Sequence, residues 1–181
     1  NLTKGITCSK TFNITIPNKT SPGNYYINLT ANWTNPDNSK GTNETSINVT
    51  VASNPLINVS ETNLTGSVPD GTEKTLGNFT VFSAGNDALQ NVNFNCYSGT
   101  VCQNFTVEFI PTSILSLAAG SNQSVIVNIT VPLSYPAGDY NGTVNISAAN
   151  DNYKNLTLEV NVPVNRTWGM QPEYCEKPQT P

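Results

Sequence analysis

The chain has 181 residues, with 8 Lys and Arg against 12 Asp and Glu, a formal net charge of −4 and a pI near 4.6. It contains no His, which excludes His-based catalytic triads, His general bases and His-ligated metal sites. The acidic balance argues against nucleic-acid binding, and no apolar run approaches the roughly 20 residues that a membrane span requires.

Short runs of alternating apolar and polar residues, separated by Gly, Pro, Asn and Asp, predict β-strands along almost the whole chain. No segment shows a sustained helical period. The predicted strands of one complete unit cover 55–68, 74–83, 88–96, 101–109, 122–131, 139–149 and 153–163. Turns are predicted at 68–71, 84–87 and 149–152. Seven or eight short strands in about 110 residues favour an all-β, immunoglobulin-like sandwich.

The first 52 residues repeat the second half of that unit. With a shift of 115 residues, the match is ungapped from Asn1 to Tyr25, and a two-residue gap restores it afterwards. The matching segments are FNITIP (12–17) with VNITVP (127–132), SPGNY (21–25) with PAGDY (136–140), INLTA (27–31) with VNISA (144–148), and TSINVTV (45–51) with LTLEVNV (156–162). Such self-similarity is typical of tandem modules.

The repeat divides the chain into three parts. Residues 1–52 form a partial module, residues 53–164 a complete sandwich and residues 165–181 a Pro-rich tail. A half-sandwich alone leaves its inner apolar face and strand edges uncovered. Two interpretations follow: the chain is a slice of a longer tandem array, or the tail of one subunit completes the partial module of the next by strand addition.

In the second interpretation the tail is a donor strand, and Trp168, Met170 and Tyr174 are its assembly anchors. Fully extended, its residues span about 56–61 Å. Head-to-tail contacts of this kind build open filaments from copies of one chain. The tail is too short to replace a whole missing half-module, so the partial module would be a reduced sandwich unless other parts of the assembly cover it.

The four Cys residues form two groups. Cys96 and Cys102 flank a short loop and predict a local disulfide that joins two strands across a turn. Cys8 and Cys175 lie near opposite ends of the chain, and three pairings stay open for them: with each other between neighbouring subunits, with segments outside this sequence, or with each other by fold-back.

The pattern Asn-x-Ser/Thr, with x not Pro, occurs 17 times, where about six occurrences are expected from this composition. Strand alternation alone can place Thr two residues after Asn, but Asn itself is depleted in strands, so we expect dense N-glycosylation and an extracellular or cell-surface location. The acceptors are Asn1, Asn13, Asn18, Asn28, Asn32, Asn43, Asn48, Asn58, Asn63, Asn78, Asn104, Asn122, Asn128, Asn141, Asn145, Asn155 and Asn165.

Residues 114–148 resemble the Ig-like repeat domains of archaeal and some bacterial cell-surface proteins. The resemblance lies in Leu117 with Gly120, in Val131-Pro132 and in Gly138-Asp139-Tyr140. The first part of the chain carries Gly5, Ile16-Pro17 and Gly23-Asn24-Tyr25 at matching positions. The resemblance implies a structural or adhesive role outside the cell, no catalytic residues, and corner tyrosines whose hydroxyls bond the backbone. The density of Thr-ended acceptor sites is also similar to that of archaeal surface filaments and surface-layer proteins.

The sequence contains no residue pattern that predicts an enzyme or a cofactor site. The acidic side chains are scattered, without the paired spacing of a glycosidase. Asp70, Asp87, Asp139 and Asp151 could bind Ca²⁺ together with loop carbonyls, but the sequence has no EF-hand-like spacing, so a turn role is favoured. Aromatic residues suggest sugar binding as a weaker alternative to a core or anchoring role: Tyr25, Tyr26, Trp33, Tyr135, Tyr153 and Trp168.

The sequence therefore predicts a structural subunit of a heavily N-glycosylated extracellular filament or cell-surface array, assembled from copies of itself by strand complementation, a disulfide or both. The alternative is a stalk or adhesin segment of a larger surface protein that binds carbohydrate or another cell.

Overall fold

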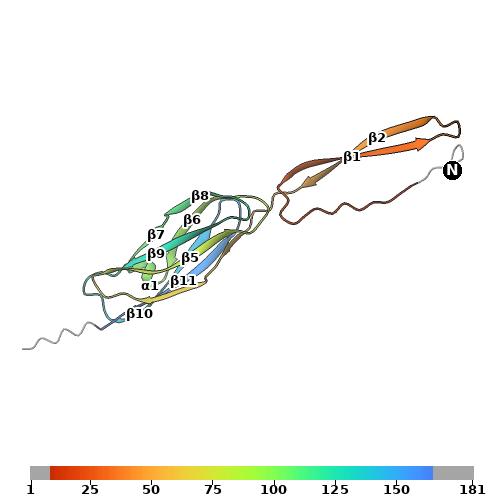
Figure 1. Cartoon of the computed structure of the whole chain (residues 1–181). Coiled ribbons are helices and arrows are strands. Elements are labelled where there is room, and N and C mark those ends of the chain that lie inside the picture. The colour runs from red at the N-terminus through yellow and green to blue at the C-terminus, as the bar shows by residue number, and fades with distance from the viewer. Residues whose placement is uncertain (1–8, 165–181) are drawn as a thin grey trace, which may run out of the picture.

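The computed structural model describes residues 9–164. Two parts lie end to end in it (Figure 1): a long β-hairpin with an extended segment beside it, and a sandwich of two β-sheets. We call residues 9–51 the hairpin unit and residues 57–162 the sandwich. The all-β sandwich fold predicted from the alternation is confirmed. Within the described residues, no helix has the length and apolar character needed to cross a membrane.

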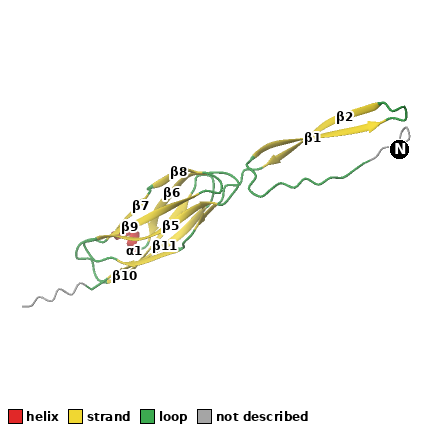
Figure 2. Ribbon diagram, in the orientation of Figure 1, coloured by secondary structure: helices red, strands yellow, loops and turns green. Residues whose placement is uncertain are grey.

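The strands of the sandwich form two sheets, whose strand order differs from the chain order (Figure 2). One sheet has the order β4 (Asn63–Ser67), β11 (Tyr153–Val162), β10 (Gly138–Ser147), β6 (Leu89–Ser98) and β8 (Ser113–Leu117). The other has the order β3 (Ile57–Val59), β5 (Glu73–Ser83), β9 (Asn122–Thr130) and β7 (Thr106–Ile110). All pairings are antiparallel except that between β4 and β11.

The core lies between the two sheets because alternate residues of β5, β9, β10 and β11 point inward. On β9, Val125, Val127 and Ile129 are fully buried, and on β11 Leu156 and Leu158 are fully buried. Their chain neighbours face solvent. This alternation is the pattern that the sequence shows.

The hairpin unit contains a pair of strands like β10 and β11, but its described residues form no second sheet. β1 (Gly23–Thr34) pairs with β2 (Lys40–Val51) over their whole length. Residues 9–17 are extended beside this hairpin without belonging to a sheet. An isolated two-stranded hairpin is at best marginally stable in water, so this unit requires further packing.

The predicted repeat is present in the backbone geometry. Gly23 pairs with Val51 in the hairpin, and Gly138 pairs with Val162 in the sandwich, so β1 corresponds to β10 and β2 to β11. The register stays in step along the strands, and the two-residue gap that the sequence comparison placed after Tyr25 is wrong. Instead, the β1–β2 hairpin is longer at its tip: 12 residue pairs in register, against 10 for β10 and β11.

Three further points of the sequence analysis need correction. The predicted strand 101–109 is split into a short helix, α1 (Thr100–Asn104), and strand β7. Strand β8 was not predicted, because Leu115 interrupts the alternation on the solvent side and is 79% exposed. The predicted strand 55–68 is also two strands, β3 and β4, separated by a bend.

Candidate assembly surface

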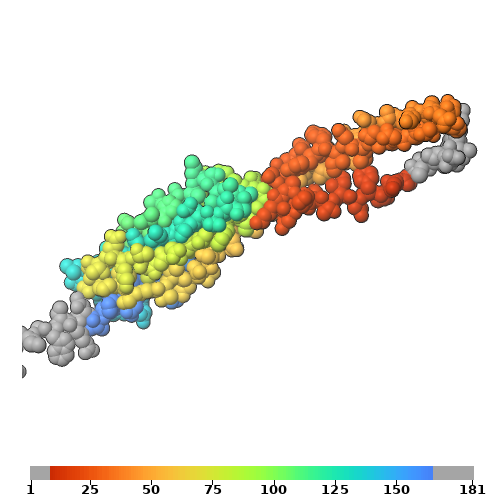
Figure 3. Space-filling model, in the orientation of Figure 1, coloured from red at the N-terminus to blue at the C-terminus, as the bar shows by residue number. Residues whose placement is uncertain are grey.

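The hairpin unit carries an apolar face that the described residues cover only in part. Phe12, Ile14 and Ile16 from the extended segment point toward it, and the alternation of β1 and β2 places a second set opposite: Tyr25, Ile27, Leu29, Ile47, Val49 and Val51. We call these nine residues the open face. A cleft of about 270 Å³ lies between the inner end of the segment and the hairpin. Farther out, toward the hairpin tip, Figure 3 shows a gap between the two.

The equivalent residues of the sandwich are buried, whereas those of the open face are partly exposed. The repeat places Phe12, Ile14 and Ile16 at the positions of Val127, Ile129 and Val131. The first three are 49%, 42% and 46% exposed, whereas each of the other three is 0% exposed. The same pattern of apolar residues is therefore fully buried in one copy and nearly half exposed in the other.

The chain enters the two units in the same way. Thr20 N and Tyr135 N donate to the carbonyl oxygens of Pro17 and Pro132, both at 3.3 Å. The preceding residues, Lys19 and Ser134, both have a positive φ, at 63° and 61°. The backbone from residues 9–17 into β1 thus follows the same path as the backbone from β9 into β10. It does so although, in the described part of the chain, only the sandwich has both of its sheets.

In the sandwich, an aromatic cluster packs where the chain passes from β9 into β10. The rings of Phe105, Tyr135 and Tyr140 lie within 4.8–5.6 Å of one another, all in edge-to-face arrangements. In the hairpin unit Tyr25 takes the place of Tyr140 and Thr20 that of Tyr135. Tyr25 therefore lacks aromatic partners within the described residues and is 41% exposed.

A turn of the sandwich holds the hairpin unit in place. Asn86 Nδ2 donates to the carbonyl oxygens of Thr20 and Ala52, at 3.2 and 3.0 Å. Asn54 N donates to Asn86 Oδ1 at 2.8 Å, and Asn86 N donates to Asn54 O at 3.1 Å. One side chain thus bonds the chain just before β1 and just after β2. Sequence reasoning identified residues 84–87 only as a turn and missed this role.

Four turn carboxylates considered for Ca²⁺ are engaged in hydrogen bonds. Asp70 accepts from Ser134 N, Asp87 from Ser53 Oγ and Ala88 N, Asp139 from Asn161 Nδ2, and Asp151 from Ile57 N. Within residues 9–164, no three His, Cys, Asp or Glu side chains gather as a metal-ligand set. These interactions favour the turn role.

Two exposed carboxyl groups have a pKa below the ordinary value of 3.8. The hydroxyl of Ser39 lowers the pKa of Asp37, and the hydroxyl of Ser53 lowers the pKa of Asp87; a backbone N–H adds to each effect. Asp37 lies in the hairpin turn and Asp87 at the junction between the two units. In both cases the hydrogen bonds favour the charged form.

Cys96 and Cys102 form a disulfide. It joins β6 to α1, rather than two strands as the sequence suggested. α1 packs on Gly142 of β10: a Cβ at Gly142 would lie 2.9 Å from Val101 Cβ and 3.1 Å from Cys102 Sγ. A glycine is therefore required where the helix crosses the sheet.

The acceptor asparagines of the described residues all reach the surface. None of the fifteen is buried, and only Asn128 and Asn145 are half-buried. In the sandwich, the residue that follows the Asn is usually buried, as at Leu64, Phe79 and Ile129. Asn1 and Asn165 lie outside the described residues, as do Cys8, Cys175, Trp168, Met170 and Tyr174.

The aromatic residues considered for sugar binding have different surroundings. Tyr135 belongs to the aromatic cluster, and Trp33 lies across Gly41 of the paired strand. Tyr26 and Tyr153 are 71% and 59% exposed. Tyr25 belongs to the open face, and Trp168 lies outside the described residues.

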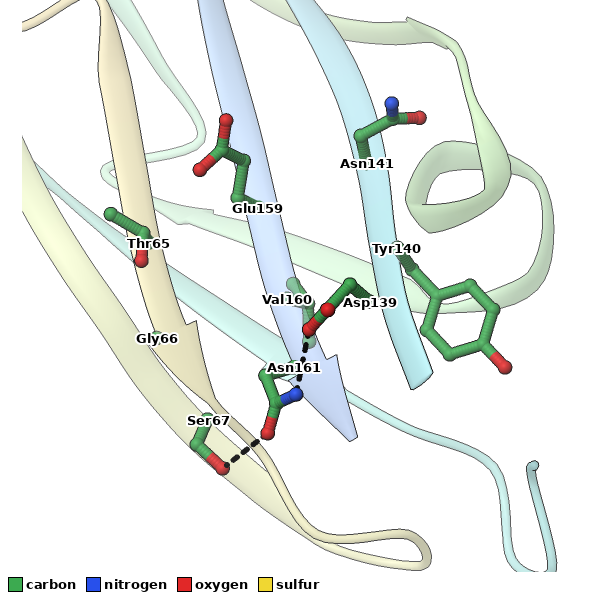
Figure 4. A pocket seen from close by; sticks show the side chains of 9 residues that line it. All are labelled: Thr65, Gly66, Ser67, Asp139, Tyr140, Asn141, Glu159, Val160 and Asn161. Atoms are coloured by element: carbon green, nitrogen blue, oxygen red, sulfur yellow. Dashed lines mark hydrogen bonds between the residues drawn. The ribbon is translucent and has the colours of Figure 1, made fainter. Parts of the chain in front are cut away.

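A second hollow lies on the outer surface of β4, β11 and β10 (Figure 4). Asn161 Nδ2 donates to Asp139 Oδ1 at 2.6 Å there, and Ser67 Oγ donates to Asn161 Oδ1 at 3.4 Å. The ring of Tyr140 points away from these groups, and its hydroxyl donates to Pro136 O. No aromatic ring of residues 9–164 faces this hollow, so the described chain offers no platform for a sugar ring there.

Part of the sandwich matches a known family model. Residues 68–149 are similar to the NPCBM-associated NEW3 domain of alpha-galactosidase. No curated protein sequence matches the chain significantly.

Three of the solved structures that resemble the chain illustrate these likenesses. A family 123 glycoside hydrolase from Clostridium perfringens has 13% identity and a TM-score of 0.45 over 56% of this chain and 22% of its own. The E. coli chaperone DraB has 13% identity and a TM-score of 0.44 over 60% and 56%. Domains 4–9 of the surface layer protein SbsC have 20% identity and a TM-score of 0.40 over 81% and 19%.

The chain thus spans only about a fifth of the hydrolase and of the surface layer fragment. All three TM-scores lie below 0.5, so no functional inference rests on them.

Proposed function

We propose that this chain is a structural subunit of a heavily N-glycosylated extracellular filament or cell-surface array, and that its copies join head to tail by strand complementation, by a disulfide, or by both. One observation carries the proposal. Ile14 is 42% exposed in the hairpin unit, while Ile129, its counterpart in the repeat, is fully buried. Alternating apolar residues of this kind normally line the interior of a sandwich. Where they are exposed, they mark a surface that binds a partner.

The arrangement of the two units supports a role in an elongated assembly. They lie end to end (Figure 1), and Asn86 bonds both chain segments at their junction. The first and the last described residues lie at opposite ends of this pair of units (Figure 1), which favours contacts between unlike surfaces that propagate into open filaments.

The surface supports an extracellular location. The acceptor asparagines are solvent-accessible on both sheets of the sandwich, for example Asn63 on β4 and Asn78 on β5. Glycans at these positions would coat the outer faces without disturbing the core, because the next residue points inward.

Two measurements of the purified chain test glycosylation and assembly: its mass under denaturing conditions and its association state in native solution. We expect a monomer mass well above 19.4 kDa from the glycans, and concentration-dependent association in native solution. If Cys8 and Cys175 join subunits, a ladder of multimers on a denaturing gel collapses to one band on reduction. A monomer at all concentrations, with and without reductant, would contradict head-to-tail assembly; a mass of 19.4 kDa would contradict the glycan coat.

A second candidate is a stalk or adhesin segment that binds carbohydrate or another cell. The exposed rings of Tyr26 and Tyr153 favour it, together with the similarity of residues 68–149 to a domain named from alpha-galactosidase. Substitutions Tyr26→Ala and Tyr153→Ala would then abolish glycan binding without lowering the unfolding temperature, whereas the structural subunit shows no glycan binding to lose.

The same comparison applies to the tryptophans that the sequence singled out. For a sugar-binding surface, Trp33→Ala and Trp168→Ala remove glycan binding and leave stability unchanged. For a structural role, they lower stability or assembly instead.

A further inference from the structure

The repeat indicates what kind of partner the open face accepts. In the sandwich, the inner side of β10 is covered in part by α1, and Gly142 makes room for it. Gly142 pairs with Leu158, and in the hairpin unit Ile27 pairs with Ile47 at the same register position. The residue that must be glycine under α1 is therefore isoleucine in the hairpin unit.

This difference excludes one kind of partner. A Cβ at Gly142 would already lie 2.9 Å from Val101 Cβ, so an isoleucine side chain fills the volume that α1 occupies. A second copy of the β5–β8 region, with its helix and disulfide, does not fit on the open face. The partner has to lie flat on Ile27, as an extended strand does.

Within the described residues, Tyr25 on the open face also lacks the aromatic neighbours that Tyr140 has in the sandwich. Phe105 and Tyr135 surround Tyr140 in the sandwich, whereas Thr20 stands in the place of Tyr135 beside Tyr25. A matching partner brings its own aromatic residues to the cleft between Ile14, Ile16, Tyr25 and the end of β2.

Residues 167–174 have the composition that this cleft requires. In the sequence TWGMQPEY the even-numbered residues are Trp168, Met170, Pro172 and Tyr174, and the odd-numbered ones are Thr167, Gly169, Gln171 and Glu173. An extended chain places the first set on one face and the second on the other. Pro172 also restricts the segment to an edge position in a sheet.

We propose that residues 167–174 of a second copy of this chain occupy the open face as an extended strand, with Trp168, Met170 and Tyr174 against Ile14, Ile27 and Tyr25. This inference rests on the proposed head-to-tail assembly and adds its mode. It adds the orientation of the donor residues, their contacts on the open face and the exclusion of a helical partner.

The path of the chain points to a second copy rather than the same one. Asp151, just before β11, accepts a hydrogen bond from Ile57 N beside the junction with the hairpin unit. β11 then runs away from the junction to Val162, so the chain leaves the sandwich at the end opposite to the hairpin unit (Figure 1).

The test uses the glycosylated full chain and two matched pairs of variants. On the donor side, Trp168→Asp places a charge on the apolar set, and Gln171→Asp places it on the polar set. On the acceptor side, Ile47→Asp changes the open face, and Ser46→Asp changes the adjacent residue on the other face of β2. Association is measured by sedimentation velocity, and folding of the sandwich by thermal unfolding.

We expect Trp168→Asp and Ile47→Asp each to weaken association about tenfold or more, because each buries an unpaired carboxylate, while the two controls associate as the wild type does. A mixture of the two defective variants provides a further test. Trp168→Asp keeps an intact open face and Ile47→Asp keeps an intact donor, so the mixture forms heterodimers that do not grow further.

The variant Ile27→Gly separates an extended partner from a helical one. It removes contacts from an extended strand and weakens association, whereas it would create room for a helix and strengthen it. If the wild type assembles but Trp168→Asp and Gln171→Asp behave alike, or if Ile27→Gly strengthens assembly, this mode is wrong and head-to-tail assembly stands. If the wild type never assembles, the proposed function itself is wrong.

Discussion

Tyr25 and Tyr140 make the same hydrogen bond in two different surroundings. Each hydroxyl donates to the carbonyl oxygen four residues earlier, Ser21 O and Pro136 O, at 2.8 Å in both cases. The resemblance to surface-protein repeats implies this corner for both residues. Because Tyr140 is covered by Phe105 and Tyr25 is not, the corner forms from local sequence and does not depend on the rest of a sandwich.

The substitution Tyr140→Phe therefore isolates the hydroxyl. The ring keeps its packing in the cluster, so we expect a loss of about 0.5–1.5 kcal/mol in the free energy of unfolding of the sandwich. Chemical denaturation measures it, with Tyr25→Phe as the control that leaves the sandwich transition unchanged. Equal effects of the two substitutions on that transition would contradict this assignment.

The junction depends on a single side chain, Asn86. Asn86→Ala removes the acceptor for Asn54 N and the donor for Thr20 O and Ala52 O. We expect the Asn54 amide to exchange with solvent about fivefold faster or more, since one hydrogen bond contributes about 1 kcal/mol. Hydrogen exchange followed by NMR measures it, and the exposed Asn152→Ala serves as control. Unchanged exchange at Asn54 would show that other contacts hold the junction.

The parts of the structure that follow from local patterns could be predicted from the sequence. Alternation located the inward residues of β5, β9, β10 and β11, and repetition located the second corner tyrosine. Register could not be predicted in the same way. An alignment scores residue identity, whereas the pairing of Gly23 with Val51 fixes Ile27 opposite Ile47 and moves the additional residues to the hairpin tip.

Helix α1 and the role of Asn86 were beyond a sequence pattern. The five residues of α1 are too few to show a helical period, and they include the β-branched Thr100 and Val101. The helix is held by the disulfide and by the space above Gly142, both of which are tertiary. Asn86 acts on Thr20, which is 66 residues away in the chain.

The disulfide between Cys96 and Cys102 closes a short loop, with a sequence separation of 6 residues. Replacing both residues by Ser should destabilise the sandwich by about 2–3 kcal/mol, as loop-closure entropy predicts for a short loop. Urea denaturation measures the change. The variant is preferable to a reductant, because a reductant would also act on Cys8 and Cys175. A loss below the error of the measurement would mean that packing alone holds α1.

Acid should loosen the junction through Asp87. Its pKa in the folded chain lies below the ordinary value of 3.8, first because of the Ser53 hydroxyl and then because of Ala88 N. A lowered pKa means that the stabilisation is present above pH 3.8 and is lost as the pH falls through the folded value. Titration of the Asp87 carboxyl by NMR should show that Ser53→Ala raises its pKa. The pKa of Asp37, lowered by Ser39, should stay unchanged as the internal control. A shift of both, or of neither, would contradict the assignment.

The close contact at Gly142 can be tested with a double-mutant cycle. Gly142→Ala places a methyl group 2.9 Å from Val101 Cβ and 3.1 Å from Cys102 Sγ, so we expect a destabilisation of about 1–3 kcal/mol. Val101→Ala alone also destabilises the sandwich, because Val101 is fully buried and its loss leaves a cavity. Shortening Val101 gives the helix room to shift away from the new methyl group. The double variant should therefore lose less stability than the two single variants together, with a coupling of about 0.5 kcal/mol or more measured by chemical denaturation.

Strict additivity would show that the strain at Gly142 does not come from its contact with Val101. The presence of Ile27 at the equivalent position would then no longer exclude a helical partner on the open face.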